Sequence, residues 1–301
     1  MILGFIPLWV VFGLAAAILG ATWLLIQEHF KAPGFAMAYW NKIVTALVTM
    51  PFALFMGFPQ DPLFYLFLTM NASLWLISDI ILFGNVAKHG AGVISRLLPL
   101  AVLASFVLWF FFDPALLQQY LSTPVRSALI VIVLCATVFF TTRLKKCEVS
   151  WSALRSVWFV IFAAIIGPIL IKTITQHTGM KPLEGAFSYV FCEAVFMLFM
   201  WSIYYAIRHP VPFAAMISRQ TIKAGLSIGA ICGFSVVLGI AGYSYVDNPA
   251  FMPAIKYLDS VFILMFYKIT GRKETADVKT GLAVVVCAAL LIILKSGNWN
   301  F

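Results

Sequence analysis

The stretch MILGFIPLWVVFGLAAAILGATWLLIQ, residues 1–27, decides the fold class of this chain. A transmembrane α-helix needs about 20 consecutive apolar residues to cross the hydrocarbon core of a bilayer, and this stretch is long enough. It lacks the basic N-terminal region and the small-residue cleavage site of a signal peptide. We therefore expect it to stay in the protein as the first transmembrane helix.

The composition extends this expectation to the whole chain. Of 301 residues, 63 % are hydrophobic and 10 % are charged, and the mean hydropathy is +1.01. Soluble domains carry about 25 % charged residues. This many apolar residues cannot all pack into one core surrounded by water, so the composition predicts an integral membrane protein. No folded basic surface suits a nucleic acid, and the five scattered cysteines show no metal-binding or disulfide spacing.

Ten apolar segments are candidate transmembrane helices when the chain is scanned with a window of about 19 residues. They are continuously apolar and show no period-two alternation, which favours helices over a β-barrel. The predicted fold class is thus an all-α polytopic membrane protein with ten transmembrane helices. Their expected ranges are 3–26, 34–57, 62–86, 91–112, 124–142, 153–173, 185–207, 222–245, 249–270 and 277–295.

Basic residues are unevenly distributed between the two sets of connecting loops. Most lie in loops that follow odd-numbered spans, including the basic stretches 143–155 and 271–279. The positive-inside rule makes those loops cytoplasmic and both termini extracytoplasmic. We expect these two basic stretches to contact anionic lipid headgroups. The short loops are typical of a bacterial inner (plasma) membrane protein.

Two alignments within the chain predict an internal repeat. ISRLLPLAVLASFVLWFFFDP (94–114) aligns with AIKYLDSVFILMFYKITGRKE (254–274), which places Arg96 on Lys256. GFAMAYWNK (34–42) aligns with GAFSYVFCE (185–193), which places Lys42 on Glu193. The repeats would be residues 1–147 and 148–301, five helices each, within one membrane domain. Five spans per unit force opposite orientations, so the repeats are inverted, as in many secondary transporters. Chance similarity between apolar segments is the alternative.

The segment NPAFMPAIKYLDSVFILMFYKITGRKETADVKTGLAVVVCAALLII (248–293) and Lys42 in AYWNKIVTAL carry a family resemblance. With them, essentially the whole chain resembles the EamA-like, ten-helix branch of the drug/metabolite transporter superfamily. AIKYL also resembles the Lys-bearing ninth helix of the nucleotide-sugar and sugar-phosphate branches. The resemblance implies paired five-helix repeats and transport rather than catalysis. Two features depart from the family pattern. FFFDPALLQQY (110–120) lacks the family's Gly-Glu signature, and the charge bias predicts extracytoplasmic termini, whereas many relatives have cytoplasmic termini.

Six ionisable side chains fall within the expected spans: Lys42, Asp79, Arg96, Glu193, Lys256 and Asp259. A charge at the middle of a bilayer costs about 2.5–3.5 kcal/mol on insertion scales, so such residues usually face the protein interior and mark a pathway. Lys256 and Asp259 lie three positions apart and could neutralise each other on one helix face. Alternatively, Lys256 and Arg96 form a cationic pair that binds phosphate or carboxylate.

The pair Lys42 and Glu193 also has two interpretations. They could form a salt bridge that joins the two halves, or Glu193 could be a proton-coupling group whose pKa is raised by desolvation. Asp79 is a second coupling candidate, unless it lies at the membrane edge near Lys88. The hypothetical coupling or gating set is therefore Asp79, Glu193 and Asp259.

Aromatic and amide side chains precede Lys42 directly. Tyr39, Trp40 and Asn41 could form the wall of a small-molecule pocket, with Tyr257 as the counterpart near the ninth span. The alternative is an aromatic belt at the membrane interface. The hypothetical substrate-binding set is Tyr39, Trp40, Asn41, Lys42, Arg96, Lys256 and Tyr257.

The sequence thus predicts a secondary transporter that moves a small anionic metabolite, phosphorylated or amphipathic, or a lipid phosphate headgroup, by alternating access. Export of amino acids or aromatic compounds is the alternative. A membrane-embedded lipid-modifying enzyme is disfavoured because the chain has no HExxH, no paired carboxylates beside a nucleophile and no Gly-rich phosphate loop. The expected partners are a small-molecule or lipid-linked substrate, membrane lipids, and a coupling proton or counter-substrate. We expect no cofactor, metal or catalytic residue, and a monomer or homodimer.

Overall fold

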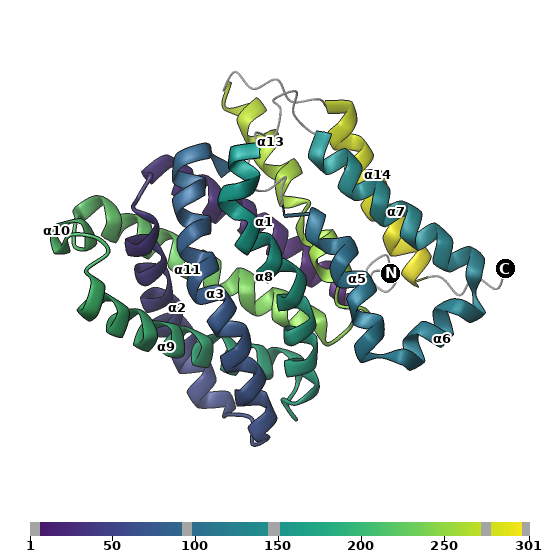
Figure 1. The fold of residues 1–301 in the computed structure, drawn as a ribbon, viewed down its shortest axis with the longest axis horizontal. Helices are drawn as coiled ribbons and strands as arrows, with labels where there is room; N and C mark the ends of the chain where they lie inside the picture. Colours follow the sequence, from purple (N-terminus) through teal and green to yellow (C-terminus); the bar gives the residue numbers. More distant parts are fainter. Residues whose placement is uncertain (1–6, 92–97, 144–150, 272–277, 297–301) are drawn as a thin grey trace.

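The computed structural model describes residues 7–91, 98–143, 151–271 and 278–296 (Figure 1). All regular elements in these residues are helices, which confirms the all-α fold class. They are α1 (Leu8–Phe30), α2 (Gly34–Met56), α3 (Pro62–His89), α5 (Leu100–Phe112), α6 (Pro114–Ser122), α7 (Pro124–Arg143), α8 (Trp151–Gln176), α9 (Pro182–Arg208), α10 (Phe213–Met216), α11 (Arg219–Tyr243), α12 (Phe251–Lys256), α13 (Asp259–Ile269) and α14 (Val278–Ser296).

Seven of the described helices are long and apolar enough to cross a membrane: α1, α3, α7, α8, α9, α11 and α14. The number rises to eight if α5 and α6, which are bent by 109° relative to each other, form one broken span. Large apolar side chains cover the outside of the bundle, and Phe55 and Ile269 are 90 % and 80 % exposed. So much exposed apolar surface suits lipid rather than water. The chain is an integral membrane protein.

Three of the ten expected spans are not among these seven helices. The expected span 34–57 is the 23-residue α2, whose polar residues, including Asn41, Lys42 and Thr45, lower its hydropathy. The expected span 91–112 is described only in part, and its α5 begins at Leu100. The third, 249–270, is not one helix.

The turn formed by Tyr257 and Leu258 divides this last segment into α12 and α13. Lys256 is the final residue of α12, and Asp259 is the first of α13. A cation at a helix C-terminus and an anion at a helix N-terminus both interact favourably with the partial charges of the helix ends. The two charges therefore stabilise two short helices at this point, which a hydropathy window does not detect.

Helices from the two halves of the sequence interleave in the bundle. α1 packs on α11, α3 packs on α8, and α2 packs on both α9 and α11. Figure 1 shows α7 and α14 lying side by side, at the C-terminal side of the molecule. The core that surrounds the candidate site is consequently built from α1, α2, α3, α8, α9 and α11 together.

Close approach of α11 to α2 depends on glycine. A Cβ atom on Gly225 would lie 2.4 Å from Cβ of Trp40, and one on Gly229 would lie 2.5 Å from Cβ of Val44. Without those Cβ atoms the two backbones come near enough for van der Waals packing, which drives helix association in lipid. The glycines therefore hold Asn41 and its neighbours against α11.

Polar contacts join the two halves at the end of the bundle where α2 ends and α9 begins. Ser188 Oγ donates a hydrogen bond to the carbonyl oxygen of Gly57 at 2.6 Å. Asp61, the N-cap of α3, accepts the backbone N–H of Leu63 at 2.9 Å and lies 2.7 Å from His177 Nδ1. The hydrogen bond from Leu63, with that from His177, holds the pKa of the Asp61 carboxyl below its ordinary value.

Candidate functional site

A cavity of about 190 Å³ lies inside the bundle, between helices of both halves. α1, α2, α3, α8, α9, α11 and the discontinuous pair α12–α13 all contribute to its wall. Its polar and ionisable lining residues are Asn41, Lys42, Asn71, Asp79, Glu193, Cys232, Lys256 and Asp259. Its aromatic lining residues are Trp23, Trp75, Phe83, Tyr189, Tyr243 and Tyr257. Pockets for drug-sized ligands are typically about 300–1,000 Å³, so this cavity suits a smaller molecule.

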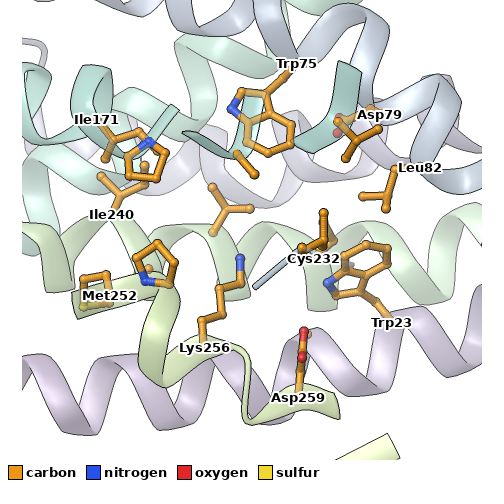
Figure 2. A pocket seen from close by; sticks show the side chains of 18 of the residues that line it. Trp23, Trp75, Asp79, Leu82, Ile171, Cys232, Ile240, Met252, Lys256 and Asp259 are labelled. Atoms are coloured by element: carbon orange, nitrogen blue, oxygen red, sulfur yellow. The ribbon is translucent and has the colours of Figure 1, made fainter. Parts of the chain in front are cut away.

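Lys256 and Asp259 enter the cavity from the break between α12 and α13. Figure 2 shows the Lys256 side chain extending to the cavity centre and the Asp259 carboxylate pointing the same way, with Trp75 and Asp79 across from them. No ion pair within 4.0 Å joins Lys256 to an acidic side chain in the described part of the chain. The expected i,i+3 pair of Lys256 and Asp259 is therefore not a direct salt bridge, although both side chains enter the same cavity from either side of a turn.

Lys42 forms an ion network with one carboxylate from each half. Its Nζ atom lies 3.0 Å from Glu193 Oε2 on α9 and 3.7 Å from Asp79 Oδ2 on α3. The side chains of Lys42 and Glu193 are only 8 % and 4 % exposed. Buried charges of this kind persist only when they are paired and hydrogen-bonded. The salt-bridge interpretation of Lys42 and Glu193 is thus confirmed as geometry, and Asp79 joins it.

The network continues through a tyrosine and an asparagine. Tyr189 donates its hydroxyl proton to Glu193 Oε1 at 2.8 Å, and Asn71 Nδ2 donates to the Tyr189 hydroxyl. Because the O–H of Tyr189 donates its hydrogen bond to Glu193, the hydroxyl oxygen accepts from Asn71, which determines the orientation of the Asn71 amide. Both oxygens of Glu193 are hydrogen-bonded, one to Lys42 on α2 and the other to Tyr189 on its own helix, so the orientation of its carboxylate is restrained.

Asp79 lies inside the bundle and away from the end of α3. It is ten residues before His89, the last residue of α3, which corresponds to about 15 Å along the helix axis. Its side chain is 13 % exposed and faces the cavity beside Lys42. The alternative in which the loop near Lys88 solvates Asp79 is therefore wrong.

Two predicted pocket residues lie elsewhere. The Tyr39 hydroxyl is hydrogen-bonded to Ser202 Oγ at 2.9 Å, and Trp40 Nε1 donates to the carbonyl oxygen of Met216 at 2.7 Å. Neither residue lines the cavity. Successive residues of a helix point about 100° apart, so Asn41 and Lys42 face inward while Tyr39 and Trp40 face neighbouring helices. Arg96 falls outside the described residues.

Tyr257 belongs to the aromatic wall as predicted, but sequence reasoning missed other residues of that wall, among them Trp23, Tyr189 and Tyr243. Tyr189 carried a usable signal, because it lies four residues before Glu193 and thus on the same helix face. Trp23 and Tyr243 carried none, since their inward orientation depends on how α1 and α11 rotate against each other. No group of three potential metal ligands occurs in the part of the chain that the structure describes.

No protein-family model matches this sequence, and no curated protein shows significant similarity to it. One solved structure, titled "Crystal structure of protein", is similar over 96 % of this chain and 99 % of its own, with a TM-score of 0.62 and 12 % sequence identity. A likeness at this identity concerns the fold alone. Fold and site together define a helical integral membrane protein with a charged internal cavity.

Proposed function

We propose that the protein is a secondary transporter that moves a small anionic metabolite across the membrane by alternating access. In particular, we propose an EamA-like member of the drug/metabolite transporter superfamily, whose substrate is a phosphorylated or amphipathic anion or a lipid phosphate headgroup. The observation that carries the proposal is the ammonium group of Lys256. It extends into an internal cavity at a helix break and forms no ion pair with the described residues.

A charged group away from bulk water is unfavourable unless an opposite charge accompanies it. The Lys42 ammonium has such partners in Asp79 and Glu193, whereas Lys256 has none within ion-pair distance among the described residues. An anionic substrate would supply that partner when it binds. A phosphate or carboxylate accepts charge-assisted hydrogen bonds from an ammonium, which are stronger than neutral ones.

Packing between the helices supports an inverted repeat. Each helix of the first half has a counterpart in the second half: α1 and α8, α2 and α9, α3 and α11, α5 and α12–α13, α7 and α14. When every helix is exchanged with its counterpart, the α1–α11 contact becomes the α8–α3 contact, and the α5–α8 contact becomes the α12–α1 contact. All four of these contacts occur in the structure. The pairs α2–α9 and α7–α14 map onto themselves. Lys42 and Glu193, equivalent in the sequence alignment, meet at 3.0 Å, as residues near a two-fold axis do.

A turn before a helix occurs in both halves. A two-residue turn precedes α13 at Tyr257–Leu258, and another precedes α5 at Leu98–Pro99. Discontinuous helices at a repeat interface are typical of secondary transporters. On this proposal α2, the segment that includes α5, and α12–α13 complete ten spans, with both termini extracytoplasmic in a bacterial inner membrane.

Asp79 and Glu193 are the proposed coupling groups. Both carboxylates share the Lys42 ammonium, and they come from opposite halves of the sequence. A proton or counter-substrate that neutralised one carboxylate would change how strongly Lys42 holds the halves together. Alternating access requires such a change in the contacts between two repeats.

A zwitterionic or aromatic substrate is the second candidate. Asp259 lines the cavity together with Lys256, and Trp23, Trp75 and Tyr243 supply aromatic wall. An amino acid could place its carboxylate on Lys256 and its ammonium on Asp259. Export of amino acids or aromatic compounds therefore stays the alternative.

Counterflow in proteoliposomes tests the proposal. Vesicles loaded with an unlabelled phosphate ester, carboxylate or amino acid would take up its labelled form, and Lys256→Gln would be measured beside the wild type. Lys268→Gln is the matched control, because it removes the same charge from the exposed face of α13. We expect anion exchange that Lys256→Gln reduces at least tenfold and Lys268→Gln leaves intact. Exchange of amino acids alone, or equal activity in Lys256→Gln, would contradict the anion proposal.

A further inference from the structure

Gly239 differs from the other glycines of α11. A Cβ atom on Gly225, Gly229, Gly233 or Gly242 would lie 2.3–3.2 Å from side chains of α2 or α12, so close packing explains these four. A Cβ atom on Gly239 would meet nothing within 4 Å. Gly239 also has no positive φ, so its backbone does not require glycine. A glycine inside a helix is less favourable than alanine, so its presence at this position needs another reason.

The space beside Gly239 belongs to the cavity. Gly239 is buried and lines the cavity wall, so its missing side chain points inward and not toward lipid. The cavity wall includes several apolar residues from α8, α11 and α12, namely Pro168, Ile171, Val236, Ile240 and Met252. Figure 2 shows Ile171, Ile240 and Met252 together on one side of Lys256, whereas Trp23 and Asp259 lie toward the other. The cavity therefore has an apolar end and a charged end, with Lys256 between them.

We infer that the substrate is a small anion with a short apolar tail, and that Gly239 determines the length of tail the site accepts. This rests on the proposed function, because the anionic group binds Lys256 as described there. The tail lies beside Gly239, where a side chain would occupy the same space. Each methylene of the tail that is buried against Ile171 and Ile240 strengthens binding. The absence of a side chain at residue 239 is thus a specificity determinant.

Calorimetric titration of the purified protein in detergent with n-alkyl phosphates, from methyl to hexyl phosphate, tests this inference. Burying one methylene strengthens binding about fourfold. We expect the wild-type dissociation constant to fall by about that factor per carbon until the tail fills the apolar end, and then to level off. Gly239→Leu adds four side-chain carbons, so we expect its best ligand to be about three carbons shorter, with hexyl phosphate weakened far more than methyl phosphate.

Two further variants keep the test decisive. Ser227→Leu adds the same side chain to an exposed face of α11 and should reproduce the wild-type profile. If Gly239→Leu does not fold, Gly239→Ala is the smaller change to measure, and it should shorten the best tail by about one carbon. An identical chain-length profile in wild type and Gly239 variants, or equal weakening of methyl and hexyl phosphate, would overturn the inference.

The outcomes separate this inference from the proposed function. If no alkyl phosphate binds, or if Lys256→Gln binds as the wild type does, the anion site itself is refuted. If binding depends on Lys256 but is insensitive to tail length, the anion site stands and the tail site is refuted.

Discussion

Replacing Lys42 with methionine should destabilise the protein strongly, because it removes the cation that two buried carboxylates share. At an effective dielectric constant of about 20, the 3.0 Å contact with Glu193 and the 3.7 Å contact with Asp79 correspond to attractions of about 5.5 and 4.5 kcal/mol. Desolvation of the three groups offsets much of this. Removing one partner of a buried pair typically costs about 3–5 kcal/mol, and we expect Lys42→Met to fall in that range.

Thermal unfolding of the detergent-solubilised protein measures the effect. One kcal/mol shifts the midpoint by about 2 °C in a chain of this size, so Lys42→Met should lower it by roughly 6–10 °C. Glu193→Gln should cost less, because Lys42 keeps Asp79 and glutamine still accepts from Tyr189. The double variant Lys42→Met/Glu193→Gln should recover part of the loss, since fewer unpaired carboxylates remain. Lys268→Met, on an exposed face, is the control.

Two results would refute this reasoning. One is a Lys42→Met protein that unfolds within a degree of the Lys268→Met control, which would mean that the carboxylates are compensated in another way. The other is a double variant less stable than Lys42→Met alone, which would mean that Glu193 stabilises the fold independently of Lys42.

Three further predictions concern other parts of the molecule. The lowered pKa of Asp61 means that its ionised form stabilises the fold. This stabilisation is fully present above the unfolded-state pKa of about 3.9, and it is lost as the pH falls through the lower pKa of the folded state. The difference in unfolding midpoint between wild type and Asp61→Asn should therefore shrink as the pH falls from about 5 to 3. A difference that is unchanged over that range would contradict it. Gly229→Ala should lower the stability by about 1–3 kcal/mol, because its methyl group is overpacked against α2. Gly239→Ala adds a methyl group in open space and should raise the stability by up to about 1 kcal/mol. Equal unfolding midpoints for the two variants would contradict the packing argument. A variant whose only cysteine is Cys232, which lines the cavity, should react with a maleimide more slowly when substrate is bound; an unchanged labelling rate would place the substrate elsewhere.

Sequence reasoning succeeded where a local pattern suffices. Continuous apolar runs predicted helices in a membrane, because each run must satisfy its own backbone hydrogen bonds in lipid. The alignment of residues 34–42 with 185–193 brought Lys42 opposite Glu193, and the structure has them in contact. Asn41, Lys256 and Tyr257 also line the cavity as predicted, and Asp259, a residue of the predicted coupling set, lines it with them.

Two predictions failed. Tyr39 and Trp40 were placed in the pocket from their proximity in sequence to Lys42, but helix rotation turns them toward Ser202 and Met216. The sequence predicts one helix over 249–270, but the chain turns between Lys256 and Asp259 and forms the two helices α12 and α13. Orientation about a helix axis depends on neighbours that are distant in sequence.

The sequence by itself determined that lipid surrounds this protein. The composition and the length of the apolar runs require helices surrounded by lipid. The few charged residues within these helices must face the interior of the protein, because a charge in contact with lipid is unfavourable. Tertiary structure alone decided which of those charges neutralise one another. Lys42 meets two carboxylates because α2, α3 and α9 converge, while the turn after Lys256 leaves its ammonium pointing into the cavity. Electrostatic interaction falls off with distance through space, and distance through space is set by how the helices pack.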